Sequence, residues 1–314
     1  MQLYPVNQNG STGAYNLSSL LHGGKNSVLI YKGSSPGTTT TLAIKIFTKQ
    51  KGMSPSPHYL QEEAIACNLN HPNILKYFAF YPEAQYKQIR GPMRDCSAVI
   101  MEYVPHGDLF SLVTKRSLSE KLARTFFRQM VSAVAYLHEK GIAHLDLKPE
   151  NFLIGPEGLK LIDFDFSHRV DGPLTEGMRG TPGYRPPEFA RGFLKDLKAA
   201  DIYSLGITLF TMVSGCPPYD EIEQEKDVFI FDKFYDALRT DPKMFWNTHN
   251  GFRTEEGKEE YSNEFKELIM SLLAEEAKDR PSIEVIKENS WYKGEVYDQN
   301  ELEAELRDIF QSMN

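Results

Sequence analysis

The most informative segment of the chain is His144-Leu145-Asp146-Leu147-Lys148-Pro149-Glu150-Asn151, with Asp163-Phe164-Asp165 beginning twelve residues after Asn151. Short apolar runs at 152–154 and 159–162 are separated by the turn residues 155–158, and this pattern predicts an antiparallel hairpin. The open ends of a hairpin meet, so we expect Asn151 and Asp163 to lie side by side. Their side-chain oxygens are the ligands that Mg²⁺ prefers in proteins.

The same block resembles the catalytic loop of eukaryotic protein kinases, H-R-D-L-K-x-x-N, and their D-F-G metal motif. It departs from the pattern at Leu145, where arginine is usual, and at Asp165, where glycine is usual. The resemblance implies that Asp146 orients a substrate hydroxyl and that Lys148 stabilises the γ-phosphoryl charge. It also implies that the metal ligands are Asn151 and Asp163.

A lysine at position 45 lies in a predicted strand over residues 41–47. Side chains alternate along a strand, so Lys45 shares a face with the apolar Ala43 and Phe47. Such a lysine needs an anionic partner, or it lies in an edge strand and reaches solvent. The segment resembles the kinase V-A-I-K motif, which implies that Lys45 contacts the α- and β-phosphates of ATP and that Ala43 packs on adenine.

The expected partner of this lysine is a glutamate in the next helix. Ser56-Pro57 predicts a helix start, and the helix is expected to run to residue 69. The register of the family assigns the partner to Glu62, whose helical neighbours are apolar. The adjacent Glu63 is the alternative.

The phosphate-covering loop of the family matches this chain poorly. With Ile30 at the valine position of G-x-G-x-x-G-x-V, only Gly23 matches, while Lys25 and Val28 occupy the other glycine positions. Glycine there lets backbone N–H groups approach phosphate closely. Residues 23–30 therefore form either a phosphate cradle or a simple hairpin turn, and both alternatives stay open.

Residues 99–104 predict a buried strand that leads into a turn, as in the kinase hinge. The resemblance places Met101 at the gatekeeper position and the backbone of Glu102 and Val104 against adenine. Asp108 would lie near the ribose or a basic substrate residue. The nucleotide-binding set that the resemblance implies is Gly23, Ile30, Ala43, Lys45, Glu62, Met101, Glu102, Val104, Asp108 and Leu153.

The second half of the chain predicts helices. Apolar residues recur at helical spacing over 118–140, and Ser117 with Glu120 predicts a capping box at the helix start. Residues 180–188 resemble the end of the kinase activation segment, in which Glu188 would pair with Arg280.

Strands first and helices after predict an α+β fold with the two lobes of a protein kinase. We expect a flexible tail over 1–14, a small β-rich N-lobe over 15–104 and a larger helical C-lobe over 105–292. Residues 293–314 would form an acidic helix or tail.

The composition of the chain limits the classes of partner and the cellular compartments that we expect. The net charge of −8 argues against binding to nucleic acid or an anionic membrane surface, and no apolar stretch is long enough to span a bilayer. The three cysteines have no metal-ligand spacing, which favours reduced thiols. The first residues lack the basic start and the apolar run of a signal peptide, so we expect none. The expected compartment is the cytoplasm or the nucleus.

Together these features predict a serine/threonine kinase that uses ATP and Mg²⁺ to phosphorylate protein substrates, with a preference for basic sites. The catalytic loop is similar to that of myosin light chain and other calmodulin-dependent kinases. The acidic C-terminus lacks a basic amphipathic segment, which argues against calmodulin as a partner. The alternative is a pseudokinase that binds nucleotide or acts as a scaffold, because the glycine loop is degenerate and Asp165 replaces glycine.

Overall fold

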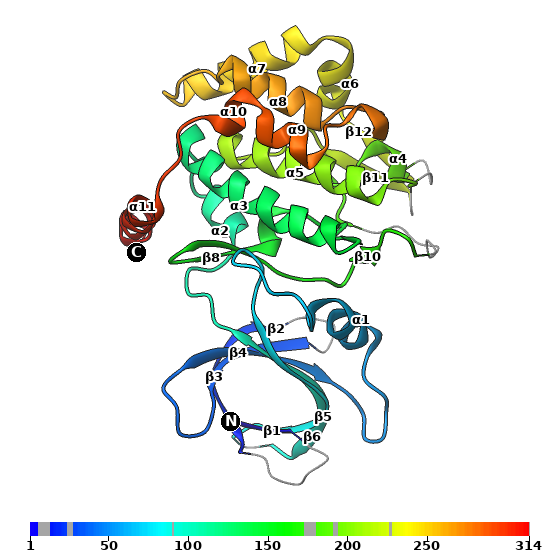
Figure 1. Cartoon of the computed structure of the whole chain (residues 1–314), viewed down its shortest axis with the longest axis vertical. Helices are drawn as coiled ribbons and strands as arrows, with labels where there is room; N and C mark the ends of the chain where they lie inside the picture. The colour runs from blue at the N-terminus through cyan, green and yellow to red at the C-terminus, as the bar shows by residue number, and fades with distance from the viewer. Residues whose placement is uncertain are drawn as a thin grey trace. The chain divides into compact units, whose positions relative to one another are not determined.

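The computed structural model describes residues 1–5, 13–23, 28–89, 91–172, 180–190, 194–225 and 228–313. The chain divides into two compact units. The first comprises residues 1–105 with 162–165, and the second comprises 106–161 with 166–314. The first is rich in strands and the second in helices (Figure 1). This is the α+β fold that the sequence predicts.

A closed antiparallel barrel forms the first unit, with strand order β1-β2-β3-β4-β6-β5. In β4, Leu42, Ile44 and Ile46 point into the barrel core, as the predicted alternation requires. The elements are β1 (Gln2–Pro5), β2 (Tyr15–Gly23), β3 (Val28–Ser34), β4 (Thr41–Thr48), α1 (Pro57–Ala66), β5 (Tyr77–Lys87) and β6 (Met93–Glu102).

The expectation of a flexible tail over residues 1–14 is wrong for β1. Its residue Leu3 pairs with Tyr15 of β2 and with Tyr86 of β5, and its side chain is fully buried in the barrel core. A strand between β2 and β5 removes two free sheet edges and buries an apolar side chain, so its long-range pairing outweighs the polar residues that follow it.

The described residues of the second unit form helices and three two-stranded sheets. The predicted hairpin over 152–162 is present, with Phe152 opposite Leu161. The elements are α2 (Leu109–Val113), α3 (Glu120–Glu139), β7 (Ile142–Ala143), a 3₁₀ turn (Pro149–Asn151), β8 (Phe152–Gly155), β9 (Gly158–Leu161), β10 (His168–Arg169), α4 (Pro187–Ala190), α5 (Leu197–Ser214), β11 (Glu221–Glu225), β12 (Val228–Phe231), α6 (Lys233–Thr240), α7 (Pro242–Glu255), α8 (Asn263–Leu272), a 3₁₀ turn (Ala277–Asp279), α9 (Ile283–Glu288), α10 (Ser290–Lys293) and α11 (Gln299–Ser312).

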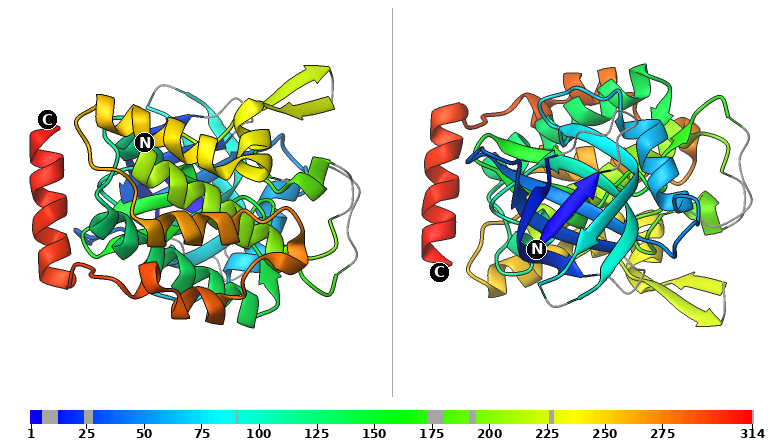
Figure 2. Two further views of the ribbon diagram at one scale, coloured as in Figure 1. Left: turned by 90° about the horizontal axis from the view of Figure 1, so that it is seen from above. Right: turned by 90° about the horizontal axis from the view of Figure 1, so that it is seen from below.

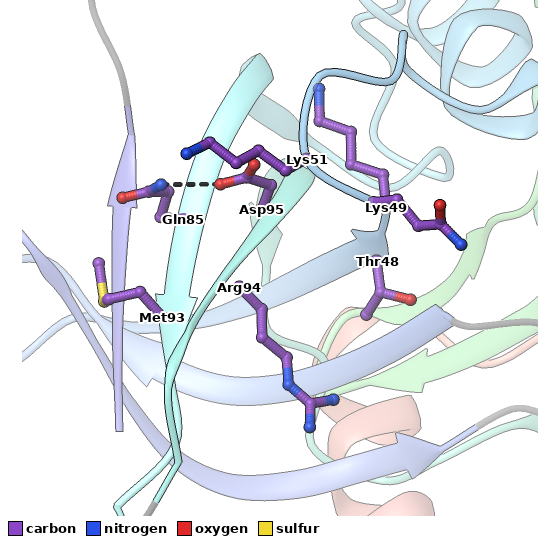
Figure 3. Close-up of a pocket in the computed structure, with 8 residues that line it drawn as sticks. Thr48, Lys49, Lys51, Gln85, Met93, Arg94 and Asp95 are labelled. Atoms are coloured by element: carbon purple, nitrogen blue, oxygen red, sulfur yellow. Dashed lines mark hydrogen bonds between the residues drawn. The ribbon is translucent and has the colours of Figure 1, made fainter.

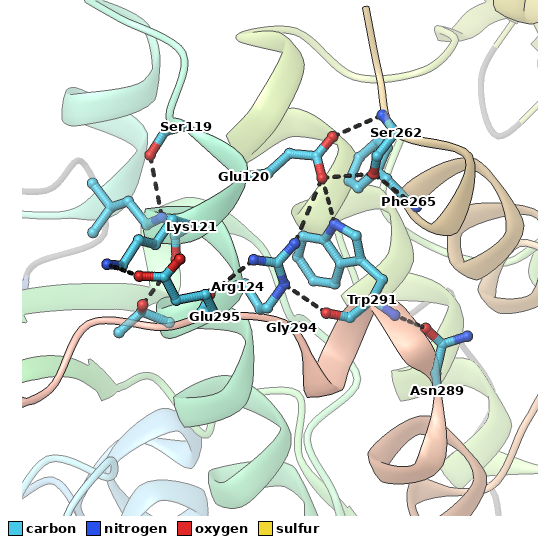
Figure 4. A network of polar contacts seen from close by, with 12 residues as sticks. Ser119, Glu120, Lys121, Arg124, Ser262, Phe265, Asn289, Trp291, Gly294 and Glu295 are labelled. Carbon is cyan, nitrogen blue, oxygen red and sulfur yellow. Dashed lines mark hydrogen bonds and ion pairs between the residues drawn. The ribbon is translucent and has the colours of Figure 1, made fainter.

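The start of α3 differs from the prediction. Its N-cap is Ser119, whose hydroxyl accepts from the backbone of Leu122, so the predicted capping box is wrong. Glu120 instead accepts hydrogen bonds from Ser262 and from the indole of Trp291 (Figure 4). These partners are distant in sequence, and no local pattern signals them.

The same network fixes the chain that leads to α11. Arg124 donates to the carbonyls of Trp291 and Glu295, and the carboxylate of Glu295 lies 2.6 Å from Lys121 Nζ (Figure 4). The predicted C-terminal acidic segment contains the helix α11, which begins with a capping box and buries one apolar face. Among the described helices, none has the length and apolar character needed to cross a membrane.

We expect Leu3→Ala to lower the free energy of unfolding by about 2–5 kcal/mol, because it leaves a cavity in the barrel core. Urea unfolding followed by fluorescence measures this change. The matched control is Leu20→Ala on β2, whose side chain is 52% exposed, and its effect should be within about 0.5 kcal/mol. Equal effects of the two substitutions would contradict the role assigned to β1.

Candidate active site

A buried ion pair lies in the first unit. Lys45 Nζ on β4 lies 2.7 Å from Glu62 Oε2 on α1, and the hydroxyl of Tyr77 donates to Glu62 Oε1 at 3.1 Å. Glu63, the alternative partner, instead accepts from Tyr59. Ser56 caps α1 as the sequence predicts and sets the helical register that turns Glu62 inward.

The electrostatics of Lys45 follow from its surroundings. Burial lowers the pKa of the ammonium, but the carboxylates of Glu62, Asp163 and Asp165 outweigh burial and raise it. Lys45 therefore stays charged. A fixed cation of this kind suits the contact with phosphate that the sequence predicts.

The residues at 163–165 place two carboxylates near this lysine in the same unit. Asp163 adopts a left-handed backbone with φ of 64°, which non-glycine residues rarely do and which is concentrated at functional sites. Asp165 Oδ2 lies 3.1 Å from His58 Nδ1 on α1. Its Oδ1 is buried and has no hydrogen-bond partner among the described residues.

This donor set fits a divalent cation. Burial raises the pKa of Asp165 most, Lys45 opposes this effect, and Asp163 and Glu62 add to it. Carboxylate charge is thus left partly uncompensated, and hard oxygen donors suit Mg²⁺. Asp163 would hold the ion. Asn151 belongs to the other unit, so the expected proximity of Asn151 and Asp163 stays a prediction.

Asp201 of α5 shapes the catalytic loop in the second unit. Its buried carboxylate accepts from the backbone N–H groups of His144 and Leu145 at 2.9 and 2.8 Å and lies 2.8 Å from His138 Nε2. These bonds hold Leu145 in a left-handed conformation with φ of 64°. The unusual backbone sets the direction in which the chain enters Asp146.

Asp146 lies at the centre of a short polar chain. The hydroxyl of Thr181 donates to Asp146 Oδ1 at 2.6 Å and accepts from Lys148 Nζ at 2.5 Å, while Lys148 lies 2.9 Å from Asp146 Oδ2. Burial raises the pKa of Asp146, but Lys148 and the Thr181 hydroxyl outweigh burial and lower it. Asp146 is therefore an ionised carboxylate with a fixed orientation.

Gly180 allows Thr181 to approach the loop. It has φ of 85°, and a Cβ atom there would lie 2.7 Å from the carbonyl oxygen of Leu145. Any other residue would push the segment away from Asp146. The glycine is visible in the sequence, but the close approach that requires it is not.

Asn151 is held by the same aspartate. Its Nδ2 donates to the backbone carbonyl of Asp146 at 2.7 Å and to Asp146 Oδ2 at 2.9 Å. The amide nitrogen is thereby committed, which leaves the amide oxygen as the atom for a cation. The 3₁₀ turn that ends at Asn151 leads directly into β8.

Leu145 has a structural role at the position where arginine is usual. Its side chain is buried in an apolar cluster with Ala143, Leu197 and Ala200. The cluster anchors the loop on α5 without any cation. The sequence shows that the arginine usual at this position is absent. Only the fold shows that the side chain of Leu145 packs in an apolar cluster instead.

The predicted nucleotide residues of the first unit lie on neighbouring strands. Ile30 pairs with Lys45, Ala43 pairs with Met101, and the backbone N–H of Glu102 donates to the carbonyl of Lys76. Val104 follows β6. Gly23 ends β2 opposite Leu29. Lys25 lies outside the described residues, so the cradle and the simple turn both stay open.

In the second unit, Asp108 is the N-cap of α2, where its Oδ1 accepts from the backbone N–H of Ser111 at 2.7 Å. Its backbone bridges to Leu153 on β8. One carboxylate oxygen of Asp108 is therefore engaged in capping α2. The predicted contacts of both residues with nucleotide stay predictions.

Sequence reasoning missed two residues that contact this machinery, Tyr77 and His58. Tyr77 supports Glu62 from β5, and its ring meets that of Phe164 edge-on. His58 meets Asp165 from the first turn of α1. Neither residue belongs to a spacing pattern that would mark it. The predicted pair of Glu188 and Arg280 is confirmed as a bidentate contact of 2.7 Å.

A pocket of about 630 Å³ also lies in the first unit, at the end of β4 beside β5 and β6. Lys51 lies near Asp95, while Arg94 points away from both (Figure 3). Because the cations do not converge on one point, this pocket lacks the geometry of an anion site. It contains none of the residues predicted for the active site. Its lining is Thr48, Lys49, Gln50, Lys51, Gln85, Met93, Arg94 and Asp95.

Comparison with known proteins identifies the family to which this geometry belongs. Residues 15–292 match the family described as "Protein kinase domain". The chain is a member of the protein kinase family. The match covers both the ion pair of the first unit and the catalytic loop of the second.

Curated relatives agree with this kinase assignment. The chain is 31% identical to CBL-interacting serine/threonine-protein kinase 12 of Arabidopsis thaliana over 288 residues, which cover 90% of this chain and 53% of the relative. It is 29% identical to Aurora/IPL1-related protein kinase 2 of Caenorhabditis elegans, covering 81% of this kinase chain and 74% of the relative. The chain spans about half the length of the CBL-interacting kinases that it matches.

We expect Asp201→Asn to destabilise this kinase by about 1–3 kcal/mol, because an amide offers one acceptor where the carboxylate serves three donors. Urea unfolding measures the change. Glu139→Gln, an exposed position at the end of α3, is the control and should be nearly neutral. Unchanged stability in Asp201→Asn would show that the three contacts do not constrain the loop.

Proposed function

We propose that this chain is an active serine/threonine protein kinase that transfers the γ-phosphoryl group of ATP to protein hydroxyls. The observation that carries the proposal is the ionised Asp146, held from both sides by Thr181 and Lys148. The kinase motifs and the names of the relatives support it. Phosphate incorporation into a peptide library by the purified chain, with and without Mg²⁺, tests it.

Separate residues of this chain would carry out separate steps of phosphoryl transfer. ATP with Mg²⁺, when bound, supplies the phosphoryl group and the neutralising charge. Asp146 accepts a hydrogen bond from the substrate hydroxyl and orients it, and Lys148 stabilises negative charge at the transferred group. Lys45, fixed by Glu62, binds phosphate oxygens. Glu62, which also accepts a hydrogen bond from Tyr77, fixes the ammonium of Lys45 in place, so little reorganisation is needed when phosphate binds.

A preference for basic sites is supported by Glu150. Its Oε2 is buried and has no hydrogen-bond partner among the described residues. Burial raises the pKa of this carboxyl, and Asp108 and Asp146 add to the rise although Lys148 opposes it. A guanidinium from the substrate would satisfy the oxygen and compensate the charge. The preferred substrate therefore carries arginine upstream of the acceptor.

The pseudokinase alternative rests on two features, the degenerate glycine loop and the carboxylate of Asp165 where the family has glycine. Its negative charge near Asp163 would oppose binding of nucleotide phosphates unless a cation compensates it. Assignment to the calmodulin-dependent group, the absence of calmodulin control and a location in the cytoplasm or nucleus stay predictions from the sequence.

We expect Asp146→Asn to lower turnover by about 10²–10⁴-fold while ATP binding is retained, because the carboxylate acts on the hydroxyl and not on the nucleotide. Steady-state kinetics and calorimetric titration with ATP measure the two properties. The control is Asp171→Asn, an exposed aspartate of the second unit. Absence of transfer in the unaltered chain together with retained ATP binding would favour the pseudokinase.

We expect Glu150→Gln to raise the KM of a peptide with upstream arginine by about tenfold, the loss of one charge-assisted contact. A carboxyl with a raised pKa is neutral below that pKa and charged above it, so the preference for arginine should strengthen as pH rises from 5 to 7.5. Kinetics of paired arginine and alanine peptides measure this. Glu157→Gln in an exposed turn is the control, and a pH-independent preference would exclude Glu150.

A further inference from the structure

A two-stranded hairpin of β11 and β12 extends away from the helices of the second unit in both views of Figure 2. Glu221 pairs with Phe231, and Ile222 pairs with Ile230. The residues assigned to the active site lie outside this hairpin. Its sequence, Glu221-Ile222-Glu223-Gln224-Glu225 in the first strand, combines apolar and acidic residues.

The base of the hairpin is firmly anchored. The buried carboxylate of Glu221 accepts from the backbone N–H of Gly183 at 2.6 Å and pairs with Arg185 at 2.8 Å. On the other strand, Phe231 stacks on Tyr235 with ring centroids 4.0 Å apart. The hairpin therefore extends from a rigid base.

The anchor joins the hairpin to the catalytic machinery. Gly183 is two residues after Thr181, whose hydroxyl bonds to Asp146. A chain held on the hairpin would thus be held close to the segment that positions the catalytic aspartate. Nearness of this kind raises the effective concentration of an acceptor on the same chain.

One face of the hairpin exposes an apolar pair. Ile222 is 48% exposed and Ile230 is 39% exposed. The two lie directly opposite each other, on the face away from the anchoring Glu221 and Phe231, because side chains alternate along a strand. Two neighbouring exposed isoleucines form an apolar surface, and burying this surface against a partner would be favourable.

The edges of the hairpin are open as well. Within the described part of the chain, β11 and β12 pair only with each other. Two-stranded ribbons are marginally stable in water, and their unpaired backbone groups can accept a further strand. An extended segment that adds a strand would bond to these groups and cover the isoleucines.

The acidic residues of β11 determine which kind of extended segment would bind to the hairpin. The sequence of β11 is rich in glutamate, with Glu223 and Glu225 besides the Glu221 that pairs with Arg185. An added strand is therefore favoured when it carries lysine or arginine. Alternation of basic with apolar residues would match both the charge of the strand and the exposed isoleucine pair.

We propose that the β11–β12 hairpin docks an extended segment of the protein substrate, in which basic and apolar residues alternate, by adding it as a further strand. The proposal rests on the proposed function, since the docked chain carries the acceptor residue. The docking segment is separate from the residues around the acceptor, which Glu150 and Asp146 contact.

The test uses the full chain with Ile222→Thr and Ile230→Thr combined, because threonine keeps strand propensity while removing apolar contact. Val285→Thr, an exposed valine on α9, is the matched control. One peptide joins an arginine-flanked acceptor to an alternating lysine-valine segment through a flexible linker, and a second peptide lacks that segment. Thermal unfolding checks that each variant folds.

We expect the long peptide to have a KM lower than the short peptide by roughly fivefold or more, and the double variant to abolish the difference. Turnover of the short peptide should not change. Equal KM values for the two peptides in the unaltered chain would overturn the proposal. A difference that persists in the double variant would overturn it equally.

A binding measurement separates this proposal from the proposed function. In Asp146→Asn, fluorescence anisotropy of the labelled lysine-valine segment should show binding that is lost in the double variant and after N-methylation of alternate amides. Binding without any transfer by the unaltered chain would leave docking intact and reject the kinase. Transfer without such binding would reject docking alone.

Concentration-dependent dimers abolished by the double variant would make a second copy the occupant and overturn the proposal.

Discussion

The carboxylate of Asp201 is the constraint on which the catalytic loop depends. A buried carboxylate is costly unless donors surround it, and a leucine in a left-handed conformation is costly unless the backbone is held. In this kinase the same hydrogen bonds offset both costs. The N–H groups of His144 and Leu145 donate to the carboxylate of Asp201, and the carboxylate in turn holds the backbone of Leu145 in its left-handed conformation. Helix α5 is held in turn by Arg280, which donates to the carbonyl of Ala199.

In each unit of this kinase, the lysine predicted to act in the site is held against a carboxylate. Lys45 meets Glu62 at 2.7 Å, and Lys148 meets Asp146 at 2.9 Å. The carboxylates fix the two ammonium groups in position, so their orientation does not have to be created when substrate binds. Preorganised charge in a partly buried site is usually the largest contribution that a protein makes to phosphoryl transfer.

The two departures from the kinase motifs have different physical consequences. Leu145 exchanges a charged contact for burial in an apolar cluster, which stabilises the loop independently of any anion. Asp165 adds a carboxylate that contacts His58 and stays partly uncompensated. The first change fills a charged position with an apolar contact, whereas the second leaves a buried carboxylate oxygen without a partner among the described residues.

Local periodicity and spacing were sufficient to predict part of this structure. The alternation that puts Lys45 and the core residues of β4 on opposite faces, the cap at Ser56 and the β8–β9 hairpin all follow from neighbours within a few residues. Only the contacts of the folded chain show that Leu3 closes the barrel and that Glu120 bonds to distant partners, and they confirm Glu62, the predicted partner of Lys45, over Glu63. Those choices compare the energies of contacts between segments far apart in the chain, and no short pattern of residues encodes that comparison.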